Sequence, residues 1–151
     1  MKIEVVYPGR IKNPFAKEGF NEYMKRLNRF FKLNVVNVSS CRTDDRNKCL
    51  KEESKKLLKY IGSRDFILLD ANGKEFSTKE FSQFIGKYLD SARDLTFVIG
   101  GVYGVSDELK KCSNLILSLS RMTFTHSMTL MILAEQLYRV AKILSNQPYD
   151  H

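Results

Sequence analysis

Two apolar runs near the C-terminus are each followed by small and polar residues that suit contact with a ligand. Phe97-Val98-Ile99 leads into Gly100–Gly104, and Leu115-Ile116-Leu117 leads into Ser118–His126. The three glycines of the first loop have no Cβ, so they permit positive φ and a close approach of a ligand to the backbone. Because ligands bind at the carboxyl ends of parallel strands, we predict that both segments line one pocket.

Two familiar phosphate-binding signatures are missing. A dinucleotide fingerprint places GxGxxG directly after the first strand, but here the first strand candidate ends in Tyr7-Pro8-Gly9-Arg10, with a single glycine. The nucleoside triphosphate signature GxxxxGK, followed by serine or threonine, does not occur either. A nicotinamide oxidoreductase, a Rossmann-type methyltransferase and a nucleoside triphosphatase are therefore poorly supported.

Few side chains near the second run could move protons. An imidazole titrates near neutral pH, so His126 is either a general base, an RNA contact, or an ordinary hydrogen-bonded residue in a first helical turn. Arg121 follows a strand end and suits a phosphate or substrate contact. Glu135 lies in an otherwise apolar segment and needs a partner if it is buried. No Ser-His-Asp or Cys-His arrangement can be placed.

The cysteines indicate a reducing compartment. Cys41, Cys49 and Cys112 form no CxxC pair, and their odd number argues against a disulfide framework. The only histidines are His126 and His151, so the spacing offers no ligand set for a zinc or iron site. We expect no metal and a cytoplasmic location.

Charge and length narrow the class of protein further. The 151 residues suit one domain, spanning 1–151, with a substantial core. The net charge of +8 favours a polyanionic partner such as nucleic acid, although such a charge can also serve solubility alone. No apolar run approaches the roughly 20 residues that span a bilayer, so we expect no membrane association.

Strand and helix patterns alternate along the chain, which predicts an α/β fold with a mostly parallel sheet flanked by helices. The predicted strands are 2–7, 33–38, 65–70, 95–99 and 115–119. The predicted helices cover about 20–31, 48–60, a segment capped by Thr78, a short segment from Ser106 to Cys112, and 126–144. Asn72-Gly73 is typical of a turn after the third strand. The last helix is apolar on several sides, so it is either a central core helix or also a dimer interface.

Four segments together make the chain recognisable. They are Phe97-Val98-Ile99-Gly100-Gly101, Leu117-Ser118-Leu119-Ser120-Arg121-Met122-Thr123, Thr125-His126 and Glu135-Gln136-Leu137-Tyr138-Arg139. With them the chain resembles the RlmH family of bacterial ribosomal RNA methyltransferases. The resemblance implies a SPOUT-type α/β fold with a C-terminal trefoil knot, acting as a homodimer. It further implies S-adenosyl-L-methionine as the cofactor and N3 of a pseudouridine in 23S rRNA, in the assembled ribosome, as the methylated atom.

The same resemblance implies a set of site residues. The cofactor pocket would comprise Leu69, Gly100, Leu119, Ser120, Arg121, Met122, Thr123 and Phe124. The candidates for assisting loss of the N3 proton are His126, Arg139, Tyr149 and His151. Family members commonly end in Tyr-His plus a residue or two, whereas this chain ends in Tyr149-Asp150-His151, which shifts the tail histidine by one position.

A non-enzymatic function competes with this interpretation. The positive charge would also suffice for a basic RNA-binding or ribosome-assembly factor. Such a factor binds RNA without any response to S-adenosylmethionine, so a direct binding measurement separates the two classes.

Overall fold

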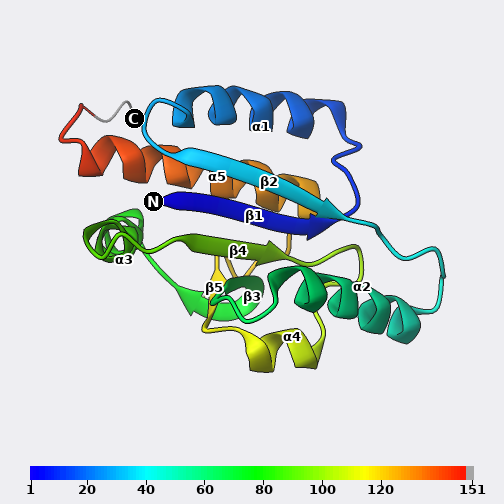
Figure 1. Ribbon diagram of the computed structural model, residues 1–151. Coiled ribbons are helices and arrows are strands. Elements are labelled where there is room, and N and C mark those ends of the chain that lie inside the picture. Colours follow the sequence, from blue (N-terminus) through cyan, green and yellow to red (C-terminus); the bar gives the residue numbers. More distant parts are fainter. Residues whose placement is uncertain (149–151) are drawn as a thin grey trace.

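The computed structural model describes residues 1–148. Five parallel strands form one sheet in the order β2-β1-β4-β3-β5, which confirms the predicted α/β class (Figure 1). The strands are β1 (Lys2–Pro8), β2 (Lys32–Val38), β3 (Ile67–Glu75), β4 (Leu95–Ile99) and β5 (Leu115–Ser118). The helices are α1 (Pro14–Leu27), α2 (Arg46–Ile61), α3 (Thr78–Asp90), α4 (Asp107–Cys112) and α5 (His126–Leu144).

Helices cover both faces of the sheet. Helices α1, α3 and α5 pack on one face, and α2 and α4 pack on the other (Figure 1). The alternation of side chains along the strands produces these two layers: Phe97 of β4 belongs to the larger cluster, whereas its neighbour Val98 belongs to the smaller one. Both strand faces are therefore apolar, as expected for a parallel sheet that helices enclose.

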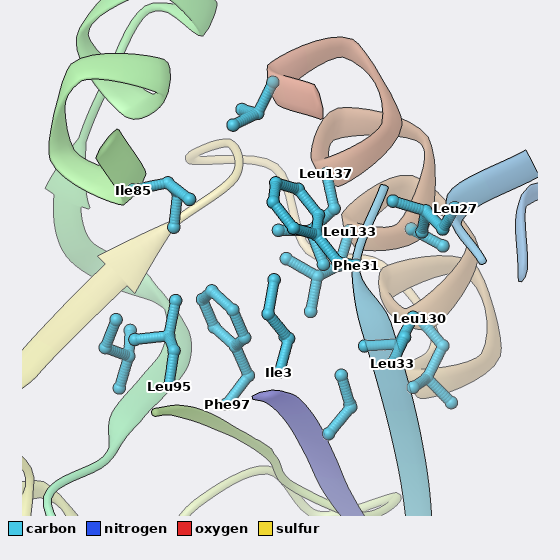
Figure 2. Packing of buried hydrophobic residues seen from close by; sticks show 14 of the residues in the cluster. Ile3, Leu27, Phe31, Leu33, Ile85, Leu95, Phe97, Leu130, Leu133 and Leu137 are labelled. Atoms are coloured by element: carbon cyan, nitrogen blue, oxygen red, sulfur yellow. The ribbon is translucent and has the colours of Figure 1, made fainter. Parts of the chain in front are cut away.

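Helix α5 forms the centre of the larger core. Leu130, Leu133 and Leu137 of α5 are essentially inaccessible to solvent and face Ile3 and Phe97 of the central strands (Figure 2). The helix packs against both α1 and α3. The prediction of a core helix is thus confirmed, and a dimer interface on the same helix stays a prediction. No helix among residues 1–148 is long and apolar enough to cross a membrane.

A buried carboxylate stands at the amino end of the central strands. Glu4 is 3% exposed and accepts hydrogen bonds from Arg64 Nη1 at 2.8 Å, Asn34 Nδ2 at 3.1 Å and Tyr60 Oη at 3.1 Å. Burial alone would raise the pKa of Glu4, but the hydrogen bonds from Arg64, Asn34 and Tyr60 and the charge of Arg64 hold it below its ordinary value of 4.5. This group ties β1 to β2 and to the end of α2.

Two helix boundaries differ from prediction. Helix α1 ends at Leu27, whereas the apolar spacing extended it to Phe31. The N–H groups of Phe30 and Phe31 both donate to the Leu27 carbonyl, so the chain turns tightly while its aromatic rings still face the core. Helix α3 is capped by Ser77, not by Thr78, because Ser77 forms a reciprocal capping box with Glu80.

The predicted turn at Asn72-Gly73 is wrong. Both residues lie inside β3, where the pairing with β5 shifts register between Leu69 and Lys74. A Cβ on Gly73 would lie 2.6 Å from the carbonyl oxygen of Ile116. The glycine therefore serves a close approach of two strand backbones at an irregularity of the ladder, which a turn dipeptide signal cannot distinguish from a reversal.

The expectation against disulfides is also wrong for one pair. Cys41 and Cys49 are joined by a disulfide, with their Cα atoms 5.3 Å apart, and Cys112 is free and exposed. The Cys41 N–H, in the polar segment before α2, also donates to Glu53 Oε2 of that helix at 3.1 Å, so this segment lies against α2. Counting cysteines and searching for CxxC spacing could not reveal this loop geometry.

Candidate functional site

A cleft of about 360 Å³ lies at the carboxyl ends of β4 and β5 and beside the middle of β3. The loops after β4 and β5 both line it, as their glycines and small polar residues predicted. It contains seven of the eight predicted pocket residues and one predicted proton acceptor. These are Leu69, Gly100, Leu119, Ser120, Met122, Thr123, Phe124 and His126.

The loop after β4 forms one wall through its backbone. The Gly104 N–H donates to the Gly101 carbonyl at 3.0 Å, which closes a tight turn with Gly104 at φ +85°. Gly100 has an ordinary φ, but a Cβ there would lie 2.4 Å from the Gly104 carbonyl oxygen. Glycine is needed at position 100 because the loop returns across its own first residue, and at 104 because of the left-handed backbone.

The loop after β5 forms the opposite wall and is held by serine hydroxyls. Ser118 Oγ lies 3.1 Å from the Ala71 carbonyl oxygen and 2.9 Å from that of Ser120. Ser120 Oγ accepts a hydrogen bond from the Met122 N–H at 3.0 Å. These bonds fix the loop against β3 and leave Met122, 75% exposed, at the rim of the cleft.

Helix α5 begins at the cleft. Its N-cap, Thr125, accepts a hydrogen bond from the Met128 N–H at 3.3 Å, and His126 in the first turn lines the cavity with Thr129. Among the described lining residues, Asp70 has the only carboxylate side chain and His126 the only imidazole. Asp70 already pairs with Lys110, its Oδ2 being 3.6 Å from Nζ. His126 is therefore the better candidate for accepting a proton in this cleft.

Sequence reasoning missed the middle of β3 as part of the site. Asp70, Ala71 and Asn72 line the cleft, and the Asn72 N–H donates to Asp70 Oδ1 at 2.8 Å. A usable signal was present: the apolar run of the third strand ends in a polar Asp70, just as the fourth and fifth strands end in small or polar residues.

Four of the other candidates stand apart from the cleft or beyond the described chain. The side chain of Arg121 is 90% exposed and points outside the cavity, with its Nε 3.7 Å from Glu75 Oε1. Arg139 contacts Glu135 on α5 and lies 13 residues from His126, about 20 Å along the helix axis. Tyr149 and His151 lie outside the described residues.

The cleft suits a small organic ligand with polar and apolar parts. Leu69, Leu119 and Phe124 supply nonpolar walls, and the two loops supply backbone donors and acceptors. Its volume falls within the usual range of ligand sites, about 300 to 1,000 Å³. The residues present therefore fit a nucleoside-sized group such as S-adenosylmethionine.

Comparison with known proteins identifies a family of methyltransferases. A family model described as "Predicted SPOUT methyltransferase" matches residues 1–151. The chain is 42% identical over 153 residues to ribosomal RNA large subunit methyltransferase H of Dictyoglomus thermophilum, covering 100% of both chains. It is 40% identical over 151 residues to the protein of the same name from Thermodesulfovibrio yellowstonii, covering 99% of each.

Solved structures share the fold at low sequence identity. A tRNA (m1G37) methyltransferase from Aquifex aeolicus superposes with a TM-score of 0.59 at 13% identity, covering 100% of this chain and 75% of that one. A probable methyltransferase from Bordetella pertussis gives a TM-score of 0.58 at 12% identity, covering 93% of this chain and 96% of that one. The full-length family match and the cleft agree: this chain belongs to the SPOUT methyltransferase family and is an enzyme that uses S-adenosylmethionine.

Proposed function

We propose that this chain methylates N3 of a pseudouridine in the 23S rRNA of the large subunit, with the assembled ribosome as its substrate. The observation that carries the proposal is the full-length similarity to proteins named ribosomal RNA large subunit methyltransferase H, at 33 to 42% identity. The net charge of +8 supports a polyanionic substrate. A ribosomal substrate implies that the enzyme acts in the cytoplasm. In this proposal residues 1–151 form one catalytic domain with a C-terminal trefoil knot.

S-adenosylmethionine, when bound, supplies an electrophilic methyl group on a positively charged sulfur. The backbone of Gly100 and of residues 119–124 would hold it, with Leu69 and Phe124 packing against its nonpolar parts. Displacement at a methyl carbon needs the nucleophile in line with the leaving sulfur, so the two loops contribute chiefly by orientation. The tight turn at Gly101–Gly104 and the Ser118 hydroxyl keep these loops in fixed positions.

His126 is our candidate for accepting the N3 proton. It is the imidazole on the cleft wall and stands at the start of a well-capped helix, so its position is constrained. General-base assistance typically contributes about 10²- to 10⁴-fold to a rate. We expect His126→Ala to slow single-turnover methylation by at least about a hundredfold while leaving cofactor affinity nearly unchanged.

Arg139 and the tail residues Tyr149 and His151 act, in this proposal, across a homodimer. Arg139 lies about 20 Å along α5 from His126, too far to share a substrate atom within one chain. Three apolar side chains near the cleft support a partner there: Val102 is 83% exposed, Met122 75% and Phe124 42%. The exposed Arg121 side chain, which lies outside the cleft, would contact a phosphate. A fully active monomer in sedimentation experiments would contradict the dimer.

The test is transfer of a labelled methyl group from S-adenosylmethionine to ribosomes and, separately, to free 23S rRNA. Both substrates come from cells that lack this activity, and the modified base is then mapped. We expect methylation at one pseudouridine of the ribosome. RNA binding without methyl transfer, combined with no heat of binding for S-adenosylmethionine, would instead identify a non-enzymatic assembly factor.

A further inference from the structure

A second cluster of reactive groups lies outside the cleft. Cys49 and Glu53 are four residues apart on α2 and therefore share a face of the helix. Cys41 comes from the loop that precedes α2 (Figure 1). The two sulfur atoms and a carboxylate oxygen of Glu53 all lie within 4.8 Å of one another. Methyl transfer as derived above uses none of these three residues.

The Glu53 carboxylate is buried but only half satisfied. The residue is 5% exposed, and its Oε2 accepts a hydrogen bond from the Cys41 N–H at 3.1 Å. Its Oε1 is fully buried and has no hydrogen-bond partner among residues 1–148. A buried carboxylate oxygen is costly unless a donor or a cation faces it. The disulfide supplies neither, so the oxidised form of the cluster leaves this oxygen without compensation.

The glycine loop of the cleft closes over this oxygen. A Cβ on Gly101 would lie 2.4 Å from Glu53 Oε1, so a larger residue there would displace the Glu53 carboxylate. The same loop also reaches the segment before α2, where Tyr103 Oη donates to the Asp44 carbonyl at 3.3 Å. Lys56 Nζ also ties the segment to α2 through the Ser39 carbonyl at 3.3 Å. The cluster thus joins three parts of the chain.

We propose that in the reduced chain Cys41, Cys49 and Glu53 bind one zinc ion. Thiolates select zinc over magnesium or calcium, and two sulfurs with one carboxylate leave a fourth tetrahedral position for water. Ligand atoms on one tetrahedral zinc lie about 3.5 to 3.8 Å apart, within reach of the present arrangement by side-chain rotation. Binding releases the two thiol protons, and the disulfide excludes the ion because it consumes both thiolates.

The sequence alone does not reveal this site, because one of its ligands, Cys41, comes from the loop before α2. Cys49 and Glu53 have the four-residue spacing of one helix face, but no spacing rule links Cys41, eight residues before Cys49, to either of them. Two thiolates and one carboxylate leave the site with one negative charge when zinc is bound. The lysines of α2 supply positive charge around it.

Cobalt titration tests the proposal. The full chain is reduced with a phosphine, freed of metal with a chelator and titrated anaerobically with Co²⁺, which reports thiolate ligands by charge-transfer absorption. We expect one Co²⁺ per chain, displaced by Zn²⁺. Cys41→Ser and Cys49→Ser should abolish the thiolate band, and Glu53→Gln should weaken binding at least about tenfold, since even outer-sphere partners contribute that much.

Cys112→Ser is the matched control, because Cys112 is free and exposed. It should leave the cobalt spectrum unchanged. In a second readout, Zn²⁺ should protect Cys41 and Cys49 of the reduced wild-type chain, but not Cys112, from alkylation. A reduced wild-type chain with no thiolate band would overturn the proposal, as would equal binding by the oxidised chain or loss of binding in Cys112→Ser.

Discussion

Replacing Gly100 with alanine is the most direct perturbation of the cleft that we propose holds the cofactor. The new Cβ would lie 2.4 Å from the Gly104 carbonyl oxygen, whereas ordinary contact begins at 3.4 Å. The loop must therefore open by about 1 Å, and the turn closed by the Gly104 N–H would be displaced with it. A misplacement of about 1 Å in a reacting site typically costs about a hundredfold in rate.

Isothermal calorimetry with S-adenosylmethionine measures the effect on cofactor affinity, and single-turnover methylation of ribosomes measures the effect on the rate of methyl transfer. We expect Gly100→Ala to weaken cofactor binding at least about tenfold, about 1.4 kcal/mol, and to slow methyl transfer about a hundredfold. Circular dichroism should show an intact fold, because the change lies in a loop.

Gly86→Ala is the control for this experiment. Gly86 lies within α3, and its Cβ would lie 3.4 Å from Leu144 Cδ2, an ordinary contact. Alanine should stabilise that helix by about 0.5 to 1 kcal/mol without changing cofactor affinity. Wild-type affinity and rate in Gly100→Ala would refute the assignment of this loop to the cofactor.

Three further predictions concern stability and are measured by chemical or thermal unfolding. Glu4→Gln should lower the free energy of unfolding by about 1 to 3 kcal/mol at pH 7. Because the pKa of Glu4 in the folded chain lies below its unfolded value of 4.5, this loss of stability is complete above pH 4.5 and disappears as pH falls through the folded pKa. An equal loss of stability at all pH values would contradict the role of the ionised Glu4 carboxylate. Gly73→Ala should cost about 1 to 3 kcal/mol by forcing β3 away from the Ile116 carbonyl, and an unchanged midpoint would argue against the close approach. Leu137→Ala should cost about 2 to 5 kcal/mol, because Leu137 is fully buried; a smaller cost would mean that α5 repacks.

The parts of the site that sequence predicted share one physical basis. Gly100–Gly104 and the segment from Ser118 each follow a short apolar run, and parallel strands end at the same edge of a sheet. Local patterns therefore sufficed to bring both loops to one cleft. The short helix predicted from Ser106 is confirmed as α4, and the Ser106 hydroxyl caps it by accepting the Leu109 N–H at 3.1 Å.

The failures arose where distant segments decide the local structure. Asn72-Gly73 looks like a turn, but it lies inside β3 where the ladder with β5 is irregular, and Gly73 packs closely against the Ile116 carbonyl of β5. Phe31 fits the helical spacing of α1, although its burial comes from packing after the helix has ended.

The sequence by itself determined the succession of strands and helices along the chain, the parallel sheet and the two loops that line the cleft. These follow from hydrophobic period, glycine placement and capping residues, which act over a few positions. Tertiary structure decided that Arg139 is remote from His126, that β3 contributes Asp70 to the cleft, and that Cys41 meets Cys49 beside Glu53. These depend on contacts between segments far apart in the chain or across a folded loop, and no local pattern encodes such distances.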